Sequence, residues 1–192
     1  FIQRTAGPLM KRVCLELGGK SAHLVLDDAD FGTVIPKAAA TICMHGGQGC
    51  GISSRLLVPR GRYAEAVELA IAGMSQVSYG DPTDATVFQG PQISARQRDR
   101  IVDYIETGVE EGARLALGGG RPQHLPTGYF VEPTLFVDVD NANTNIFVGA
   151  RRKTLIGVEH SHLQLVNERD ILPTHENANE QDAERNCVMQ NA

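Results

Sequence analysis

The residues best suited to chemistry lie in one short stretch that places a cysteine among glycines, Met44-His45-Gly46-Gly47-Gln48-Gly49-Cys50-Gly51. Glycines tolerate positive φ, so the chain can reverse sharply here. They also leave backbone N–H groups open to a developing oxyanion. A thiol exposed beside amide dipoles favours the reactive thiolate. The stretch therefore indicates that Cys50 is a nucleophile, and the alternative is a small cysteine buried in a turn.

A possible base lies upstream. Glu16 sits inside an apolar run, predicted to be a strand, that ends in a glycine pair, Val13-Cys14-Leu15-Glu16-Leu17-Gly18-Gly19. A carboxylate in such a run is expected to be partly desolvated, which raises its pKa and suits a general base. The alternative is an edge-strand glutamate that faces water.

Together the two stretches resemble the aldehyde dehydrogenase superfamily. Glu16 opens Glu16-Leu17-Gly18-Gly19-Lys20-Ser21, and Cys50, 34 positions later, ends Gly47-Gln48-Gly49-Cys50. Other parts of the chain are similar to the same family: Gly80-Asp81-Pro82 with Gly90-Pro91, and the stretch GYFVEPTLF at 128–136. The resemblance covers roughly residues 5–141. In that family the cysteine is the nucleophile and the glutamate is the general base.

The resemblance implies oxidation of a small aldehyde to a carboxylic acid through a cysteine thiohemiacetal and a thioester. It implies NAD or NADP as cofactor, with Leu17 and Gly18 beside it, no metal, and homo-oligomeric full-length relatives. Most of the family's nucleotide domain lies outside the matched stretch, so we expect the chain alone to be inactive. Two alternatives remain. One is a cofactor-independent thiol esterase or hydrolase that uses Cys50 with Glu16 or His45, a histidine where the family more often has asparagine. The other is a non-catalytic remnant.

Composition agrees with an enzyme of small molecules. The chain has 192 residues, a net charge of −5 and a pI near 5.7, which argues against a nucleic-acid partner. No apolar run approaches the length of a membrane span. The four cysteines form no CxxC pair, so neither a disulfide framework nor a zinc site is expected. A reducing, cytoplasmic location fits this pattern best.

The hydrophobic pattern predicts an α/β layered domain, in which a sheet is flanked by helices. Strands are predicted at 13–17, 22–26, 55–58, 114–117 and 129–139, the last with Pro133 as a bulge or edge position. Helices are predicted at 31–44, although Pro36 argues against that helix, and at 63–76 and 94–112. The lysine of Gly19-Lys20-Ser21 keeps two interpretations, as a group near a cofactor phosphate or as a solvated turn residue.

Three parts of the chain are expected. Residues 1–18 would end the cofactor-binding domain, and residues 19–142 would form a partial catalytic domain. Residues 143–192 would be a non-homologous, frameshifted or joined tail, with a short strand at 154–158. Residues 1–140 contain no asparagine whereas the next 52 contain eight, and only two glycines lie among the last 44 residues. The cofactor-binding glutamate that the family has near residue 146 is missing. We therefore expect the tail not to complete the sheet and to leave it with an open edge.

Overall fold

The computed structural model describes residues 1–16, 18–139 and 162–167 of the chain. Its core is one five-stranded sheet in the order β1-β2-β5-β4-β3. The bounds of the strands are β1 Ser21–Leu24, β2 Ser53–Val58, β3 Arg114–Leu117, β4 Thr134–Val137 and β5 His162–Asn167. The pairs β1–β2, β2–β5 and β5–β4 are parallel, whereas β3 is antiparallel to β4. The expected α/β layered architecture is confirmed.

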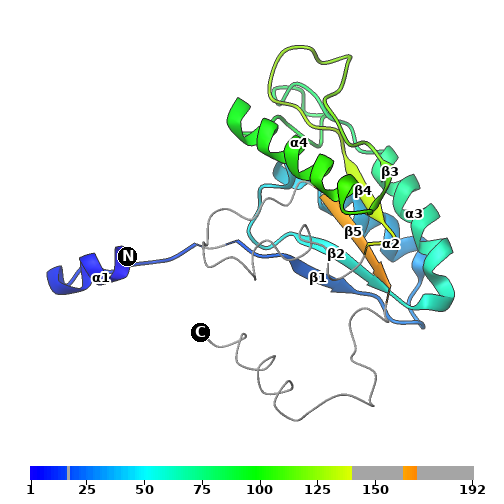
Figure 1. Cartoon of the computed structure of the whole chain (residues 1–192), viewed down its shortest axis with the longest axis horizontal. Coiled ribbons are helices and arrows are strands. Elements are labelled where there is room, and N and C mark those ends of the chain that lie inside the picture. Colours follow the sequence, from blue (N-terminus) through cyan, green and yellow to red (C-terminus); the bar gives the residue numbers. More distant parts are fainter. Residues whose placement is uncertain (17, 140–161, 168–192) are drawn as a thin grey trace, which may run out of the picture.

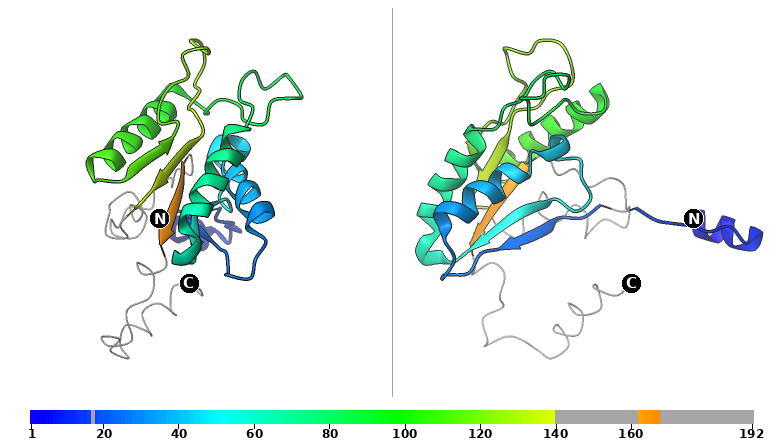
Figure 2. Two further views of the ribbon diagram at one scale, coloured as in Figure 1. Left: turned by 90° about the vertical axis from the view of Figure 1, so that its right-hand side faces the viewer. Right: turned by 180° about the vertical axis from the view of Figure 1, so that it is seen from behind.

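Helices cover both faces of the sheet, as Figures 1 and 2 show. The bounds of the helices are α1 Ile2–Ala6, α2 Phe31–Thr41, α3 Tyr63–Ser75 and α4 Ala95–Glu110. Helices α2 and α3 pack together on one face, and α4 lies on the other (Figure 2). The short helix α1 stands apart from this layered body (Figure 1).

The core on the α2–α3 face explains why these helices form. Phe31, Ile35 and Ala39 recur at helical spacing along α2 and are buried against strand residues such as Leu56. Burial of each large apolar side chain of this kind contributes about 1.5–3 kcal/mol. Pro36 lies inside α2, where it contacts Gly73 of α3. The contact is so close that a Cβ added at Gly73 would lie only 2.6 Å from the Pro36 Cα. The two backbones therefore approach closely where α3 has no side chain.

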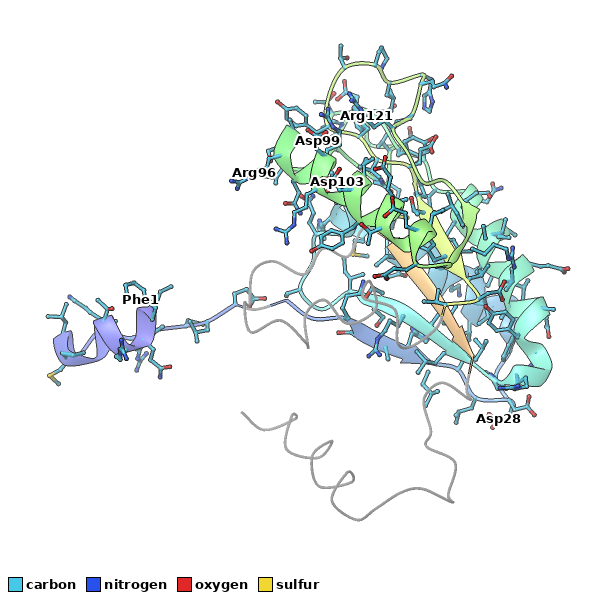
Figure 3. The ribbon with its side chains drawn as sticks, in the orientation of Figure 1. Phe1, Asp28, Arg96, Asp99, Asp103 and Arg121 are labelled. Carbon is cyan, nitrogen blue, oxygen red and sulfur yellow. The ribbon has the colours of Figure 1, made fainter. Side chains whose placement is uncertain are left out.

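Helix α4 has a second, smaller core beneath it. Ile101 and Ile105 are buried with Phe136 of β4, on the face of the sheet opposite to α2 and α3. The other side of α4 carries exposed charges, of which Arg96, Asp99 and Asp103 are labelled in Figure 3. The sequence pattern predicts an apolar face of Ile101, Ile105 and Val109; the two isoleucines are buried, whereas Val109 is exposed.

Two predicted strands are wrong or too long. Residues 11–16 have no regular structure, since no described strand lies beside them to pair. The predicted strand at 129–139 shortens to β4, because Pro133 has no N–H for a ladder and nearby backbone groups bond to loops instead. Glu132 N–H donates to the Gly120 carbonyl at 3.0 Å, and the Tyr129 carbonyl accepts from the backbone N–H of Gln92 at 2.9 Å.

The main surprise in the topology is β5. The expectation that residues after 142 add no strand to the sheet is wrong for His162–Asn167, which lies between β2 and β4 and pairs with both. The strand predicted at 154–158 falls outside the described residues. The division of the chain at residues 18 and 142, and the foreign origin of the tail, stay predictions.

Candidate active site

The loop that carries Cys50 is built from three successive residues in the left-handed region. After α2 ends at Thr41, His45, Gly46 and Gly47 have φ values of 53°, 64° and 75°. The predicted role of the glycines is thus found at two of them. Histidine and asparagine both tolerate this region better than most residues do, which gives His45 a conformational reason to be there.

Two glutamine side chains hold this loop against the rest of the domain. The Gln48 amide donates to the His45 carbonyl at 2.8 Å, and its oxygen accepts from Ile93 N–H at 3.1 Å. The Gln92 amide is buried and donates to the Gly46 carbonyl at 2.8 Å. A Cβ at Gly46 would lie 3.1 Å from the Gln92 nitrogen, so the contact suits glycine. The loop after α3 therefore positions the loop that carries Cys50. The sequence did not predict this role of Gln92, although the residue directly follows Gly90-Pro91.

The thiol of Cys50 faces Glu16. The hydrogen bond and the negative charge of Glu16 are the main causes that raise the pKa of Cys50 above its ordinary value, while the backbone N–H groups of Cys50 and Gly51 lower it. The amide dipoles thus act as predicted, but the carboxylate outweighs them. The expectation that the setting of Cys50 favours thiolate is wrong for this chain, in which the thiol keeps its proton beside a carboxylate that could accept it.

Glu16 itself differs from expectation. The residue is exposed and lies in an irregular segment, so the predicted desolvation in an apolar strand is not found. What the structure does is bring Glu16 to Cys50, across 34 positions of sequence. A thiol paired with a carboxylate on an open surface has the groups needed for addition to a carbonyl and for activation of water.

Among the described residues, Glu16 is the one other candidate side chain that acts on the Cys50 thiol. Gly18 is exposed, and Leu17 lies outside the described residues. His45 is exposed and is not among the groups that act on the Cys50 thiol. Cys43 is buried, which raises the pKa of its thiol to about 12, whereas Cys14 is exposed rather than embedded in a strand. Of the exposed cysteines among the described residues, Cys50 is thus the one whose thiol interacts with a carboxylate.

Within the described part of the chain, no helix is both long and apolar enough to cross a membrane. Among the same residues, no three or more His, Cys, Asp or Glu side chains gather in a way that could hold a metal ion.

Solved structures match this fold closely. An aldehyde dehydrogenase from Mycobacterium tuberculosis, crystallised with NAD+, is 39% identical with a TM-score of 0.75, over 91% of this chain and 34% of that one. A mutant of aldehyde dehydrogenase C from Pseudomonas syringae, complexed with NAD+ and octanal, is 34% identical with a TM-score of 0.74, over 86% of this chain and 33% of that one.

Sequence comparison agrees. The chain is 38% identical over 173 residues to 3-succinoylsemialdehyde-pyridine dehydrogenase from a Pseudomonas species, which covers 88% of this chain and 36% of that protein. It is 44% identical over 141 residues to geranial dehydrogenase from Castellaniella defragrans, over 73% of this chain and 29% of that protein. The chain thus spans about a third of the length of these relatives. Residues 1–147 match the family model described as the aldehyde dehydrogenase family, so the chain belongs to the aldehyde dehydrogenase family.

Proposed function

We propose that the protein to which this chain belongs oxidises an aldehyde to a carboxylic acid, with Cys50 as nucleophile and Glu16 as base. The observation that carries the proposal is the proximity of the Glu16 carboxylate to the Cys50 thiol, which brings together the two motifs of the family. An aldehyde is the expected substrate class because members of the family are named for that reaction.

The first step follows from the pair itself. Glu16 accepts the thiol proton as the Cys50 sulfur forms a bond to the aldehyde carbon, and the carbonyl electron pair moves to oxygen. The resulting oxyanion needs donors, and the backbone N–H groups of Cys50 and Gly51, which lie beside the sulfur, are suited to that task. Because the neighbouring carboxylate raises the pKa of the thiol and so favours its protonated form, the proton passes to Glu16 before or during attack of the sulfur on the aldehyde carbon.

The second role of Glu16 comes after oxidation of the adduct to a thioester. Once Glu16 has passed the thiol proton to solvent, its carboxylate takes a proton from water, whose oxygen bonds to the acyl carbon. The carbon–sulfur bond then breaks to release the acid and the Cys50 thiolate, which regains its proton from Glu16. The exposed position of Glu16 suits this role, since water reaches it freely. Splitting a difficult reaction through a covalent intermediate is the general advantage of a nucleophilic thiol.

NAD or NADP would supply the hydride acceptor. Of the two residues expected beside the cofactor, the structure describes Gly18, which is exposed in an irregular segment, and the chain spans about a third of the length of its relatives. We therefore expect the chain alone to oxidise no aldehyde and isothermal titration with NAD+ or NADP+ to show no saturable binding. A micromolar dissociation constant would contradict this expectation.

Acylation by an activated ester tests the catalytic pair without the cofactor. With p-nitrophenyl acetate, the chain should acquire one acetyl group on Cys50 and then lose it to water. Glu16→Gln should still acquire the group, because loss of the carboxylate lowers the pKa of the thiol and solvent can take its proton, but the variant should retain the group. Intact-mass and peptide mass spectrometry would show this. Cys14→Ser, which removes another exposed cysteine, is the matched control and should behave as the wild type does.

The outcomes separate the remaining functions. No acetylation of Cys50, or equal deacetylation by wild type and Glu16→Gln, would remove the catalytic assignment and favour a non-catalytic remnant. Rapid multiple turnover by the wild-type chain would favour a cofactor-independent thiol esterase. For the whole protein, native mass spectrometry and cell fractionation would test the expected homo-oligomer and cytoplasmic location.

A further inference from the structure

A buried lysine lies next to the segment that carries Glu16. Lys20 immediately precedes β1, and its Nζ is buried with no hydrogen-bond partner among the described residues. Buried polar groups normally form hydrogen bonds, because a group without a partner loses its hydration free energy and gains nothing in return. The residue as a whole is half-buried, whereas its nitrogen is fully buried.

A second cation lies beside the first. Arg55 of β2 donates from Nε to the Lys20 carbonyl at 2.8 Å. Its remaining guanidinium nitrogens have no partner among the described residues, and the side chain is also half-buried. Burial and the charge of Arg55 together lower the pKa of Lys20 to about 7. Within the described part of the chain, Arg55 is the charged group that acts on Lys20, and no carboxylate offsets the two cations.

The Arg55 side chain lies on the face of the sheet opposite to the apolar cluster beneath α2 and α3. Along β2, Ser54, Leu56 and Val58 are buried, and the latter two join the cluster beneath α2 and α3. Arg55 alternates with them and so faces the opposite side of the sheet. Since Ser21 pairs with Ser53 in the parallel pair β1–β2, Lys20 lies at the end of the sheet where the Cys50 loop enters β2.

We propose that Lys20 and Arg55 form a binding site for one small oxyanion, a carboxylate or a phosphate-type group. An arginine fork matches two oxygens of such a group, and a lysine ammonium adds a point charge with three donors. The anion would supply the countercharge and the acceptor that both side chains lack. The site is separate from the Cys50–Glu16 pair, but its occupation would tie down Lys20 four residues after Glu16 and restrain the segment that carries the base.

Binding should take up a proton. Because the free Lys20 amine is half-neutral near pH 7 and the anion binds the ammonium form, affinity should fall about tenfold for each pH unit above 7. Arg55 keeps its proton throughout this range. The pH dependence therefore reports on the lysine, with the arginine as a constant charge.

Isothermal titration of the chain with sodium acetate and with sodium sulfate tests the proposal. Acetate represents the carboxylate and sulfate the tetrahedral oxyanion, and neither titrates near neutral pH. Each titration is made near pH 8 in two buffers of different ionisation enthalpy, so that proton uptake is measured on the wild-type chain. Lys20→Met and Arg55→Met remove one cation each, and Lys37→Met removes an exposed lysine on α2 as the matched control.

The expected result is saturable binding of at least one anion, with uptake of about one proton, lost in Lys20→Met and Arg55→Met and kept in Lys37→Met. Binding of acetate alone would assign the site to carboxylates, and binding of sulfate alone to phosphate-type groups. Absence of saturable binding by either anion would overturn the proposal. Binding without proton uptake, or binding that survives in Lys20→Met, would overturn it equally, since the anion would then lie elsewhere.

Discussion

Replacement of Lys20 by methionine should change how the stability of the chain depends on pH. The lysine amine has an ordinary pKa of 10.5, which burial and Arg55 lower to about 7 in the folded chain. Between these two values the unfolded chain binds a proton that the folded chain does not. Stability therefore rises with pH across this window, and it is lowest below pH 7, where the buried amine must carry its charge.

The magnitude follows from the two values. The slope is about 1.4 kcal/mol per pH unit, so the full window corresponds to about 5 kcal/mol. Methionine has a similar length and no charge to desolvate. Lys20→Met should therefore raise the free energy of unfolding at pH 7 by up to about 5 kcal/mol, and its advantage should shrink to about 2 kcal/mol at pH 9.

Urea denaturation near pH 7, 8 and 9, in buffers free of carboxylate and phosphate, measures both the difference and its slope. The pH series stops at 9 because above this pH two other groups make the stability of the folded chain fall as pH rises. Burial raises the pKa of Cys43 from 9.0 to about 12 and that of Tyr63 from 10.0 to about 12, so both lower stability as pH rises further. Lys37→Met should follow the wild type. Parallel pH profiles for wild type and Lys20→Met would refute the reasoning.

Three further changes test the thiol site and the core. Glu16→Gln should shift the pH profile of Cys50 alkylation by iodoacetamide to lower pH, because the carboxylate is the main cause of the raised pKa; an unchanged profile would show that the two side chains do not interact. Gln92→Leu should lower the free energy of unfolding by about 1–3 kcal/mol in urea denaturation, because the loop carbonyl that its amide serves is left unpaired; a neutral effect would mean that water replaces the amide. Gly73→Ala should cost about 1–3 kcal/mol in the same assay, because the added methyl would press on Pro36, and wild-type stability would show that α2 and α3 separate freely.

Much of the fold was predictable because its signals are local. The apolar side chains of α3 and α4 recur with helical spacing, and both helices begin and end within two residues of the predicted bounds. Strand β3 was predicted with its observed bounds. The helical spacing of apolar residues and a short run of strand-forming residues depend only on neighbours in sequence, so both can be recognised without knowing how the rest of the chain folds.

Strand pairing was harder to predict because it depends on distant partners. Residues 13–16, from the strand predicted at 13–17, have a strand-like composition but no described strand pairs with them, and they stay irregular. His162–Asn167 lies in a stretch with no recognised strand pattern and yet pairs on both sides within the sheet. A ladder needs a neighbour with free N–H and C=O groups, and sequence pattern alone does not reveal which segment supplies it.

The sequence by itself determined the family, because Glu16 and Cys50 stand in two motifs at a characteristic separation, and it determined the residue types available for the reaction. Only the tertiary structure decided how those residues behave. It brought the Glu16 carboxylate against the thiol, so that the pKa of Cys50 rises where amide dipoles alone would lower it. It also buried the Lys20 nitrogen beside Arg55 with no carboxylate among the described residues. Charges and desolvation shift pKa values over distances of a few ångströms, and the fold determines which groups lie that close together.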